Sequence, residues 1–171
     1  MTTNATGIRI LGSLRAADGK GVVRMEDRFD TDINDMWSAL TEPSRLARWL
    51  GDVDGDLRIG GEFQARFFAS GWEGTGRVET CEAPQHLLVT TTDKDQGATH
   101  TIEATLSAEG DHTVLVIEEA GMPVEHLGGY GAGIQIHVED LAAYLAGRSR
   151  VAQGRWQELM PAYEELAKRV R

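Results

Sequence analysis

Residues 128–147 read GGYGAGIQIHVEDLAAYLAG, in which four glycines in six positions are followed by a helical apolar pattern. With about 100° per residue, the segment from about 124 to 147 places five apolar side chains in one arc, with Gln135, Glu139 and Ala146 roughly opposite. The arc consists of Leu127, Ile134, Val138, Leu141 and Leu145. The pattern predicts one long helix whose apolar arc packs against another secondary-structure element.

The segment before this helix, from Asp56 to Glu119, changes to a period of two. Its runs are DLRI, EFQARFFAS, EGTGRVETCE, HLLVTTT, HTIEATLS and HTVLVIEEAG. Short alternating runs with tight connections indicate an antiparallel meander. Phe63, Ala65 and Phe67 share one face of their strand, so we expect the long helix to cover that face and water to reach the other.

Two strands and two short helices are predicted before the meander. The strands Ile8–Leu14 and Val22–Asp30 flank AADGKG, whose Asp18-Gly19 pair suits a reversing turn. The first helix follows with apolar residues at helical spacing, namely Ile33, Met36, Trp37 and Leu40. Pro43 suits the first turn of the second helix, whose apolar stripe is Leu46, Trp49 and Leu50.

The last segment, RWQELMPAYEELAKRVR, predicts an additional amphipathic helix in which Pro161 either introduces a kink or marks the true start. We therefore expect a single domain over residues 1–171. Its core is 22–147, with an N-terminal strand extension at 8–20 and the additional C-terminal helix at 154–171.

The amino-acid composition argues against some classes of binding partner. The 171 residues carry a formal net charge of −10 with a pI near 4.9, which argues against nucleic acid and against an anionic membrane surface. No uncharged apolar run approaches the ~18 residues of a membrane-spanning helix. The single cysteine, Cys81, has no second cysteine to pair with. We expect a cytoplasmic protein.

The order of strand, two short helices, antiparallel meander and long helix resembles a known family. This is the AHSA-type branch (activator of heat-shock-protein ATPase homologue-like) of the START/polyketide-cyclase helix-grip (SRPBCC) superfamily. The likeness covers residues 22–147. It is carried by RMEDRFDTDINDMWSALTEPSRLARWLGD, LRIGGEFQARF, GTGRVETCEAPQHLLVTT, TIEATLSAEGDHTVLVIEEAGMP and VEDLAAYLAG.

The resemblance implies an α+β helix-grip fold, in which a curved antiparallel sheet of about six or seven strands wraps round the long helix. It also implies an apolar cavity between sheet and helix that holds a hydrophobic small molecule. Superfamily members include lipid carriers, cyclases and antibiotic-sequestering proteins, so the fold does not specify one reaction. Residues 8–20 and the helix after 154 lie outside the shared pattern, and they either close the cavity or build a homodimer interface.

The glycines of the opening stretch do not form a phosphate loop. Ile134 stands where G-x-G-x-x-G requires its third glycine, and no lysine follows as in G-x-x-x-x-G-K-[ST]. The glycines either precede the helix proper or permit close approach of another element. His126 and His137 are three turns apart, about 16 Å, so they cannot share a metal ion. We expect no metal and no cofactor.

Cavity candidates come from the aromatic residues and from one edge of the long helix, where Tyr130, His137 and Tyr144 recur every seven residues. The full set is Trp37, Trp49, Phe63, Phe67, Trp72, Tyr130, Ile134, His137, Leu141 and Tyr144. The aromatic residues either fill a packed core or line a cavity. His137 is either a structural histidine or a contact to the ligand.

Charged residues on the strands add a few polar candidates. Among Glu103, Glu118 and Glu119, one of an alternating pair points inward, where it would orient a ligand. Arg66 and Arg77 are polar anchors only if their faces point inward, and exposed arginines are the alternative. No residue is assigned as catalytic, because no nucleophile signature such as G-x-S-x-G is present.

Three functions remain open on the sequence. The leading hypothesis is a binding protein for a lipid-like, polyketide-like or aromatic molecule. The first alternative is a cyclase-like or hydrolytic enzyme in which His137, Tyr130 or an inward glutamate moves protons. The second is a protein-interaction or co-chaperone-like module, which only the family name suggests.

Overall fold

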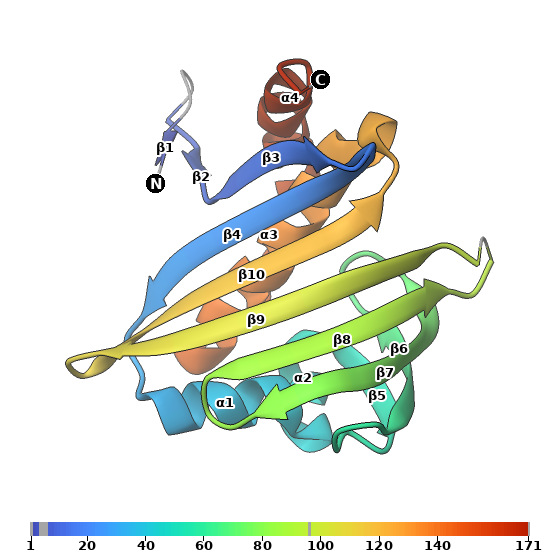
Figure 1. Ribbon diagram of the computed structural model, residues 1–171. Coiled ribbons are helices and arrows are strands. Elements are labelled where there is room, and N and C mark those ends of the chain that lie inside the picture. The colour runs from blue at the N-terminus through green and yellow to red at the C-terminus, as the bar shows by residue number, and fades with distance from the viewer. Residues whose placement is uncertain (1, 4–6, 96, 171) are drawn as a thin grey trace.

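The computed structural model describes residues 2–3, 7–95 and 97–170. An eight-stranded antiparallel sheet in the order β3-β4-β10-β9-β8-β7-β6-β5 curves round the long helix α3 (Figure 1). Its strands are β3 (Gly12–Ala17), β4 (Lys20–Phe29), β5 (Gly51–Gly55), β6 (Glu62–Phe67), β7 (Glu73–Glu82), β8 (His86–Asp93), β9 (Thr99–Glu109) and β10 (His112–Met122). A separate pair consists of β1 (Thr2–Thr3) and β2 (Arg9–Ile10).

The predicted α+β helix-grip architecture is confirmed, with three differences in the strands. The strand predicted at Ile8–Leu14 is divided into β2, which pairs with β1, and β3, which joins the large sheet. The sheet has eight strands rather than six or seven, because β3 and β5 both join it as edge strands. The strand before β6 is Gly51–Gly55, whereas the prediction placed it at residues 56–59. There the Asp56 carboxylate accepts the backbone N–H of Arg58 at 3.0 Å, so the side chain closes a turn instead.

The two short helices lie where the sequence predicts them. α1 (Ile33–Thr41) begins at the cap residue Asp32, whose carboxylate accepts the backbone N–H of Asp35 at 2.8 Å. α2 (Pro43–Trp49) begins with its proline in the first turn. Both helices lie at one end of α3 (Figure 1). No helix among the described residues combines the length and the apolarity needed to cross a membrane.

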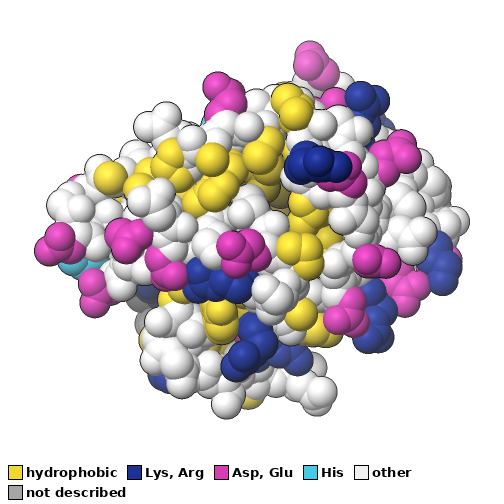
Figure 2. All heavy atoms as spheres, turned by 90° about the horizontal axis from the view of Figure 1, so that it is seen from below, with side chains coloured by type: hydrophobic (Ala, Val, Ile, Leu, Met, Phe, Trp, Pro, Cys, Tyr) yellow, Lys and Arg dark blue, Asp and Glu magenta, His cyan; other side chains and the backbone are white. Residues whose placement is uncertain are grey.

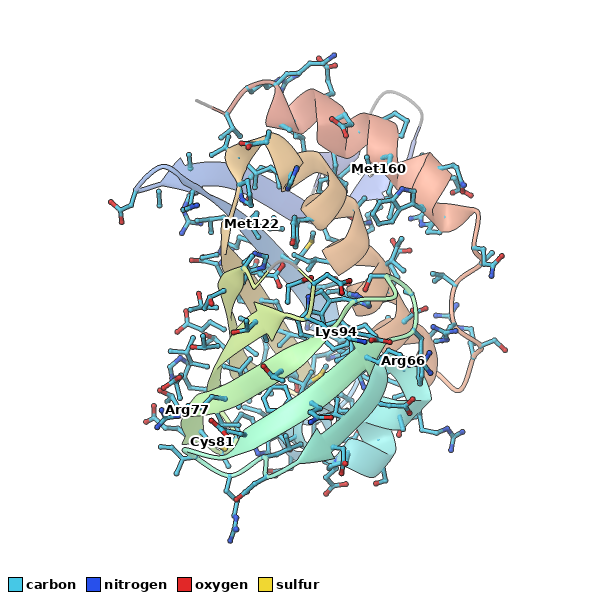
Figure 3. The ribbon with its side chains drawn as sticks, turned by 90° about the vertical axis from the view of Figure 1, so that its right-hand side faces the viewer. Arg66, Arg77, Cys81, Lys94, Met122 and Met160 are labelled. Atoms are coloured by element: carbon cyan, nitrogen blue, oxygen red, sulfur yellow. The ribbon has the colours of Figure 1, made fainter. Side chains whose placement is uncertain are left out.

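The long helix is covered on two sides rather than one. A 3-10 turn, η1 (Val124–His126), leads into α3 (Leu127–Leu145), whose predicted apolar arc packs toward the sheet. On the opposite side, α4 (Arg155–Ala167) folds back across α3 and continues through Pro161 (Figure 3). Gln135 was predicted on the outer side of α3, but it is fully buried because α4 and the N-terminal strands cover it.

The glycines of α3 allow this close crossing. They lie inside the helix rather than before it. A Cβ atom on Gly131 would lie 2.4 Å from the ring of Tyr163, and one on Gly128 would lie 2.9 Å from the carboxyl carbon of Glu164. The absence of side chains at these two positions therefore permits α4 to contact the α3 backbone.

The surface carries both signs of charge. Figure 2 shows the molecule from below the view of Figure 1, where hydrophobic side chains gather in a band. Basic and acidic side chains are interspersed around this band. The outer surface on this side therefore has no field of a single sign.

Candidate functional site

Two adjoining pockets lie between the sheet and α3. The inner pocket has a volume of about 170 Å³, and 17 of its 21 lining residues are apolar. They come from α1, α2, the sheet and α3, and include Leu46, Trp49, Val78, Ala104 and Leu141. Its polar lining consists of Thr41, Thr91, Glu119 and His137. The inner pocket is therefore an apolar space with a few polar groups, as small-molecule sites usually are.

The outer pocket is larger and more polar, with a volume of about 530 Å³. It lies under η1 and the first turns of α3, and it reaches α4 through Trp156 and Glu164. Exposed residues such as Glu125 and Glu164 form part of its rim. Its volume falls within the range of about 300–1,000 Å³ typical of ligand pockets, whereas the inner pocket alone is smaller.

The two pockets share part of their walls. The residues that line both are Phe67, Thr91, Ile102, Glu119, Ile134 and His137. They come from β6, β8, β9, β10 and α3, so the junction lies between the concave face of the sheet and the middle of α3. A ligand that enters from the outer pocket meets these residues before it reaches the inner one.

Glu119 is the acidic residue at the junction. It pairs with Ile102 across the ladder between β10 and β9, and it points to the same face of the sheet as Ile117. Burial raises the pKa of Glu119 to about 7. Near neutral pH the group is therefore divided between the neutral acid, which donates a hydrogen bond, and the carboxylate, which accepts one.

His137 enters the junction from α3. Its ring contacts Phe67 edge-on, with 5.3 Å between the ring centroids. Burial, with a smaller effect from the charge of Arg150, lowers the pKa of His137 to about 4. The imidazole is neutral at neutral pH, and its buried Nδ1 has no hydrogen-bond partner among the described residues.

Two further polar side chains face the outer pocket. The ring of His100 on β9 lies 5.2 Å from that of Tyr130 on α3, and its buried Nε2 has no hydrogen-bond partner among the described residues. Burial lowers the pKa of His100. Burial, followed by the negative charges of Glu119 and Asp93, raises the pKa of the Tyr130 hydroxyl.

Eight of the ten cavity candidates lie on the pocket walls. Trp49, Phe63 and Leu141 line the inner pocket, Trp72 and Tyr130 line the outer one, and Phe67, Ile134 and His137 line both. Trp37 and Tyr144 lie on neither wall. Trp37, on α1, is half-buried against the core, while the Tyr144 hydroxyl accepts a hydrogen bond from Arg45 at 2.9 Å. Of the three residues that recur every seven positions on the long helix, Tyr130 and His137 therefore line a pocket and Tyr144 does not.

Side chains alternate between the two faces of a strand, so some of the charged candidates face the pockets and others face the outside of the sheet. Glu119 points inward, whereas Glu118 pairs with Arg15 at 2.8 Å and Glu103 pairs with His86 at 2.7 Å. Arg66 and Arg77 are exposed on the outer side of the sheet. Figure 3 shows Arg77 toward the end of the sheet where Cys81 lies, away from α4. Neither arginine is a polar anchor in the pockets.

Several wall residues were not identified from the sequence. Thr91, His100 and Ile102 lie on neighbouring strands, with Thr91 opposite His100 in the ladder between β8 and β9. The alternation of HTIEA in β9 places His100, Ile102 and Ala104 on one face, which was the available signal. Glu164 had no such signal, because only the packing of α4 on α3 brings it to the rim.

The described residues offer no metal site, since no group of three or more His, Cys, Asp or Glu side chains among them is arranged to hold an ion. Cys81 is half-buried beside a small cluster of Phe63, Ala65 and Val78. It lines neither pocket. The polar groups at the junction are the carboxyl group of Glu119, the hydroxyl group of Thr91 and the neutral imidazole of His137, in an apolar space.

A family model described as "Activator of Hsp90 ATPase homolog 1-like protein" matches residues 30–146. Comparison with curated proteins returns no match. Among solved structures, the crystal structure of CalU16 from Micromonospora echinospora is similar, with 27% identity and a TM-score of 0.76. The match covers 91% of this chain and 95% of CalU16.

Two more distant structures support the fold alone. DynU16, described as a protein of the dynemicin biosynthetic locus, is 24% identical with a TM-score of 0.70. The match covers 80% of this chain and 51% of DynU16. Mll3558 from Rhizobium loti is 20% identical with a TM-score of 0.62, and the match covers 72% of this chain and 96% of Mll3558.

Proposed function

Because this chain belongs to the Activator of Hsp90 ATPase homolog 1-like family, we propose that it binds a hydrophobic small molecule between the sheet and α3. The ligand is lipid-like, polyketide-like or aromatic. Its apolar part fills the inner pocket, and its polar part lies at the junction with the outer pocket.

One observation carries this proposal, namely that an apolar pocket and a more polar one meet at a buried imidazole nitrogen that has no partner among the described residues. Protein interiors are normally close-packed, and buried polar atoms are normally hydrogen-bonded. The junction departs from both rules at His137, whose buried Nδ1 lies next to open space and is bonded to no residue that the structure describes. A ligand that fills the space and hydrogen-bonds there would remove both departures.

A binding screen tests the proposal. Because the proposed ligand is lipid-like, polyketide-like or aromatic, the screen contains aromatic polyketides and fatty acids beside simple aromatic amines, alcohols and acids. Native mass spectrometry of the purified protein should detect retained compounds, and thermal unfolding should shift upward with the ones that bind. Absence of any retained species and of any shift across the set would contradict a binding function.

A second candidate function rests on the opposite pKa shifts of Glu119 and His137. A carboxyl group with a pKa of about 7 and a neutral imidazole on facing elements form a general acid and a general base. The protein would then move a proton on the bound molecule, as the cyclase-like alternative requires. Incubation with each binder, followed by mass analysis, tests this: conversion that Glu119→Gln and His137→Gln both abolish supports it, and unchanged binders contradict it.

Homodimerisation is a separate proposal. It is supported by the partly apolar surface that α4 leaves uncovered, which includes Met160 and Val170. Light scattering at several concentrations should give twice the chain mass, and a constant mass of one chain would contradict it.

A further inference from the structure

The outer pocket is lined by carboxyl groups and by three histidines, His100, His126 and His137. Four carboxyl groups face it, and they come from four different elements: Asp93 of β8, Glu119 of β10, Glu125 of η1 and Glu164 of α4. No lysine or arginine among the described residues lines either pocket. The outer surface seen in Figure 2, by contrast, intersperses both signs. The electrostatic potential inside the pocket therefore favours a cation.

Two basic side chains act on the pocket histidines from outside both walls. Lys20 acts on His100 through its charge. Arg150 acts on His137 but stacks on the ring of Phe68, with 5.0 Å from its guanidinium carbon to the centroid, and it lies outside both pocket walls. His100 and His137 have lowered pKa values, so they are neutral at neutral pH. They therefore contribute hydrogen-bonding groups rather than positive charge.

A second, independent observation points to a ligand at the same place. The buried Nδ1 atom of His137 has no hydrogen-bond partner among the described residues. Glu119 lines both pockets beside it, and no described residue forms a hydrogen bond or ion pair with its carboxylate. Leaving a buried polar group unpaired costs free energy. A group that donates hydrogen bonds at the junction would satisfy the Glu119 carboxylate.

Aromatic rings around the outer pocket add to the preference for a cation. Phe67 and Trp72 lie 4.9 Å apart between ring centroids, and Tyr130 faces the same space from α3. The faces of such rings attract an ammonium group. An anionic ligand would meet four carboxyl groups, and the described wall has no lysine or arginine to compensate.

We propose that the ligand of these pockets is an amphipathic amine. Its apolar, ring-bearing body occupies the inner pocket, and its ammonium group lies at the junction, where it donates a hydrogen bond to Glu119. This inference rests on the proposed binding function and deepens it, because it names the class of ligand.

Three probes with the same body and different head groups test the inference: anthracene carrying an aminomethyl, a hydroxymethyl or a carboxylate group on its central ring. Binding is measured by probe fluorescence and by calorimetry at about pH 8, where Glu119 is mostly ionised and a primary amine is mostly protonated. We expect the amine to bind about tenfold more tightly than the alcohol, and the carboxylate to bind most weakly.

Two variants test whether the preference for the amine comes from Glu119. Glu119→Gln should weaken binding of the amine by about tenfold and leave that of the alcohol unchanged. Glu118→Gln is the matched control: it removes the same charge one residue away, where the side chain pairs with Arg15 on the outer face, and should change neither. Circular dichroism and thermal unfolding verify that both variants are folded.

The outcomes separate this inference from the proposed function. Alcohol or carboxylate bound as tightly as amine would overturn the preference for a cation and leave the binding function intact. Equal loss of amine binding in the two variants would also overturn it, because the attraction would then come from the overall negative charge. If none of the three probes binds, the inference falls, whereas the binding function falls only when the wider screen also fails.

Discussion

Tyr163 of α4 donates its hydroxyl hydrogen to the side-chain oxygen of Gln135 on α3, and both residues are fully buried. The same Gln135 oxygen accepts the backbone N–H of Leu11, and the Tyr163 oxygen accepts that of Gly12, each at 3.0 Å. The Gln135 amide also donates to the backbone oxygen of Arg9 at 2.8 Å. One buried network thus ties the N-terminal strands, α3 and α4 together.

Removing the tyrosine hydroxyl should destabilise the protein. In Tyr163→Phe the ring keeps its packing, but the N–H of Gly12 loses its side-chain acceptor. We expect a loss of about 1–3 kcal/mol in the free energy of unfolding, measured by urea denaturation. Tyr130→Phe is the control, because the Tyr130 hydroxyl faces the outer pocket and no described residue hydrogen-bonds to it. Equal stability of the two variants would contradict the network.

Alanine substitutions at two α3 glycines should change stability in opposite directions. In Gly131→Ala, the new methyl group meets the Tyr163 ring at 2.4 Å, so we expect a destabilisation of about 1–3 kcal/mol. Gly129 has nothing within 4 Å of the corresponding position. Gly129→Ala should therefore stabilise the helix by up to about 1 kcal/mol. Thermal and urea unfolding measure both, and a stabilised Gly131→Ala would show that α4 does not contact the helix there.

The stability effect of Glu119 should depend on pH. Its pKa rises from an ordinary value near 4.5 to about 7 on folding, so the folded state holds its proton more tightly. The stability it contributes is complete below about pH 4.5 and is lost as the pH rises through about 7. Relative to the wild type, Glu119→Gln should therefore gain about 3 kcal/mol between about pH 4 and pH 8. A difference independent of pH would contradict burial of Glu119.

His137 should behave in the opposite way. Its pKa falls from 6.5 to about 4 on folding, so the stability it contributes is complete above about pH 6.5 and is lost as the pH falls through about 4. His137→Gln removes this dependence. The stability gap between wild type and variant should narrow in acid, as followed by urea denaturation at several pH values. A constant gap would indicate that the imidazole is open to solvent.

Filling the inner pocket should block binding. Ala104 lies on the wall of the inner pocket, so the ring in Ala104→Phe would occupy part of the 170 Å³ space. We expect the retained compounds of the binding screen to be lost, at a stability cost of about 1–3 kcal/mol. Ala108→Phe makes the same change at an exposed position of the same strand and should bind as the wild type does. Unimpaired binding by Ala104→Phe would place the ligand elsewhere.

Most of the local structure follows from the sequence. Proline at the first turn of α2, the Asp18-Gly19 turn and the alternation of β6 to β10 depend on neighbouring residues alone, and each lies where it was predicted. Alternation also leaves one residue of the Glu118–Glu119 pair facing inward. It does not say which one, because a shift of one residue in register exchanges the two faces.

The burial of Gln135 and the composition of the pocket walls depend on how the helices and strands pack together. The helical pattern of α3 defines one apolar arc, but only the crossing of α4 determines that Gln135 is buried and that Glu164 reaches the rim of the outer pocket. The pairing of β8, β9 and β10 brings Thr91, His100 and Glu119 to one wall although they are distant in sequence. The helices and strands can be predicted from the sequence alone, since propensity and periodicity are local. The pockets and the pKa shifts depend on burial by distant segments, which no local pattern encodes.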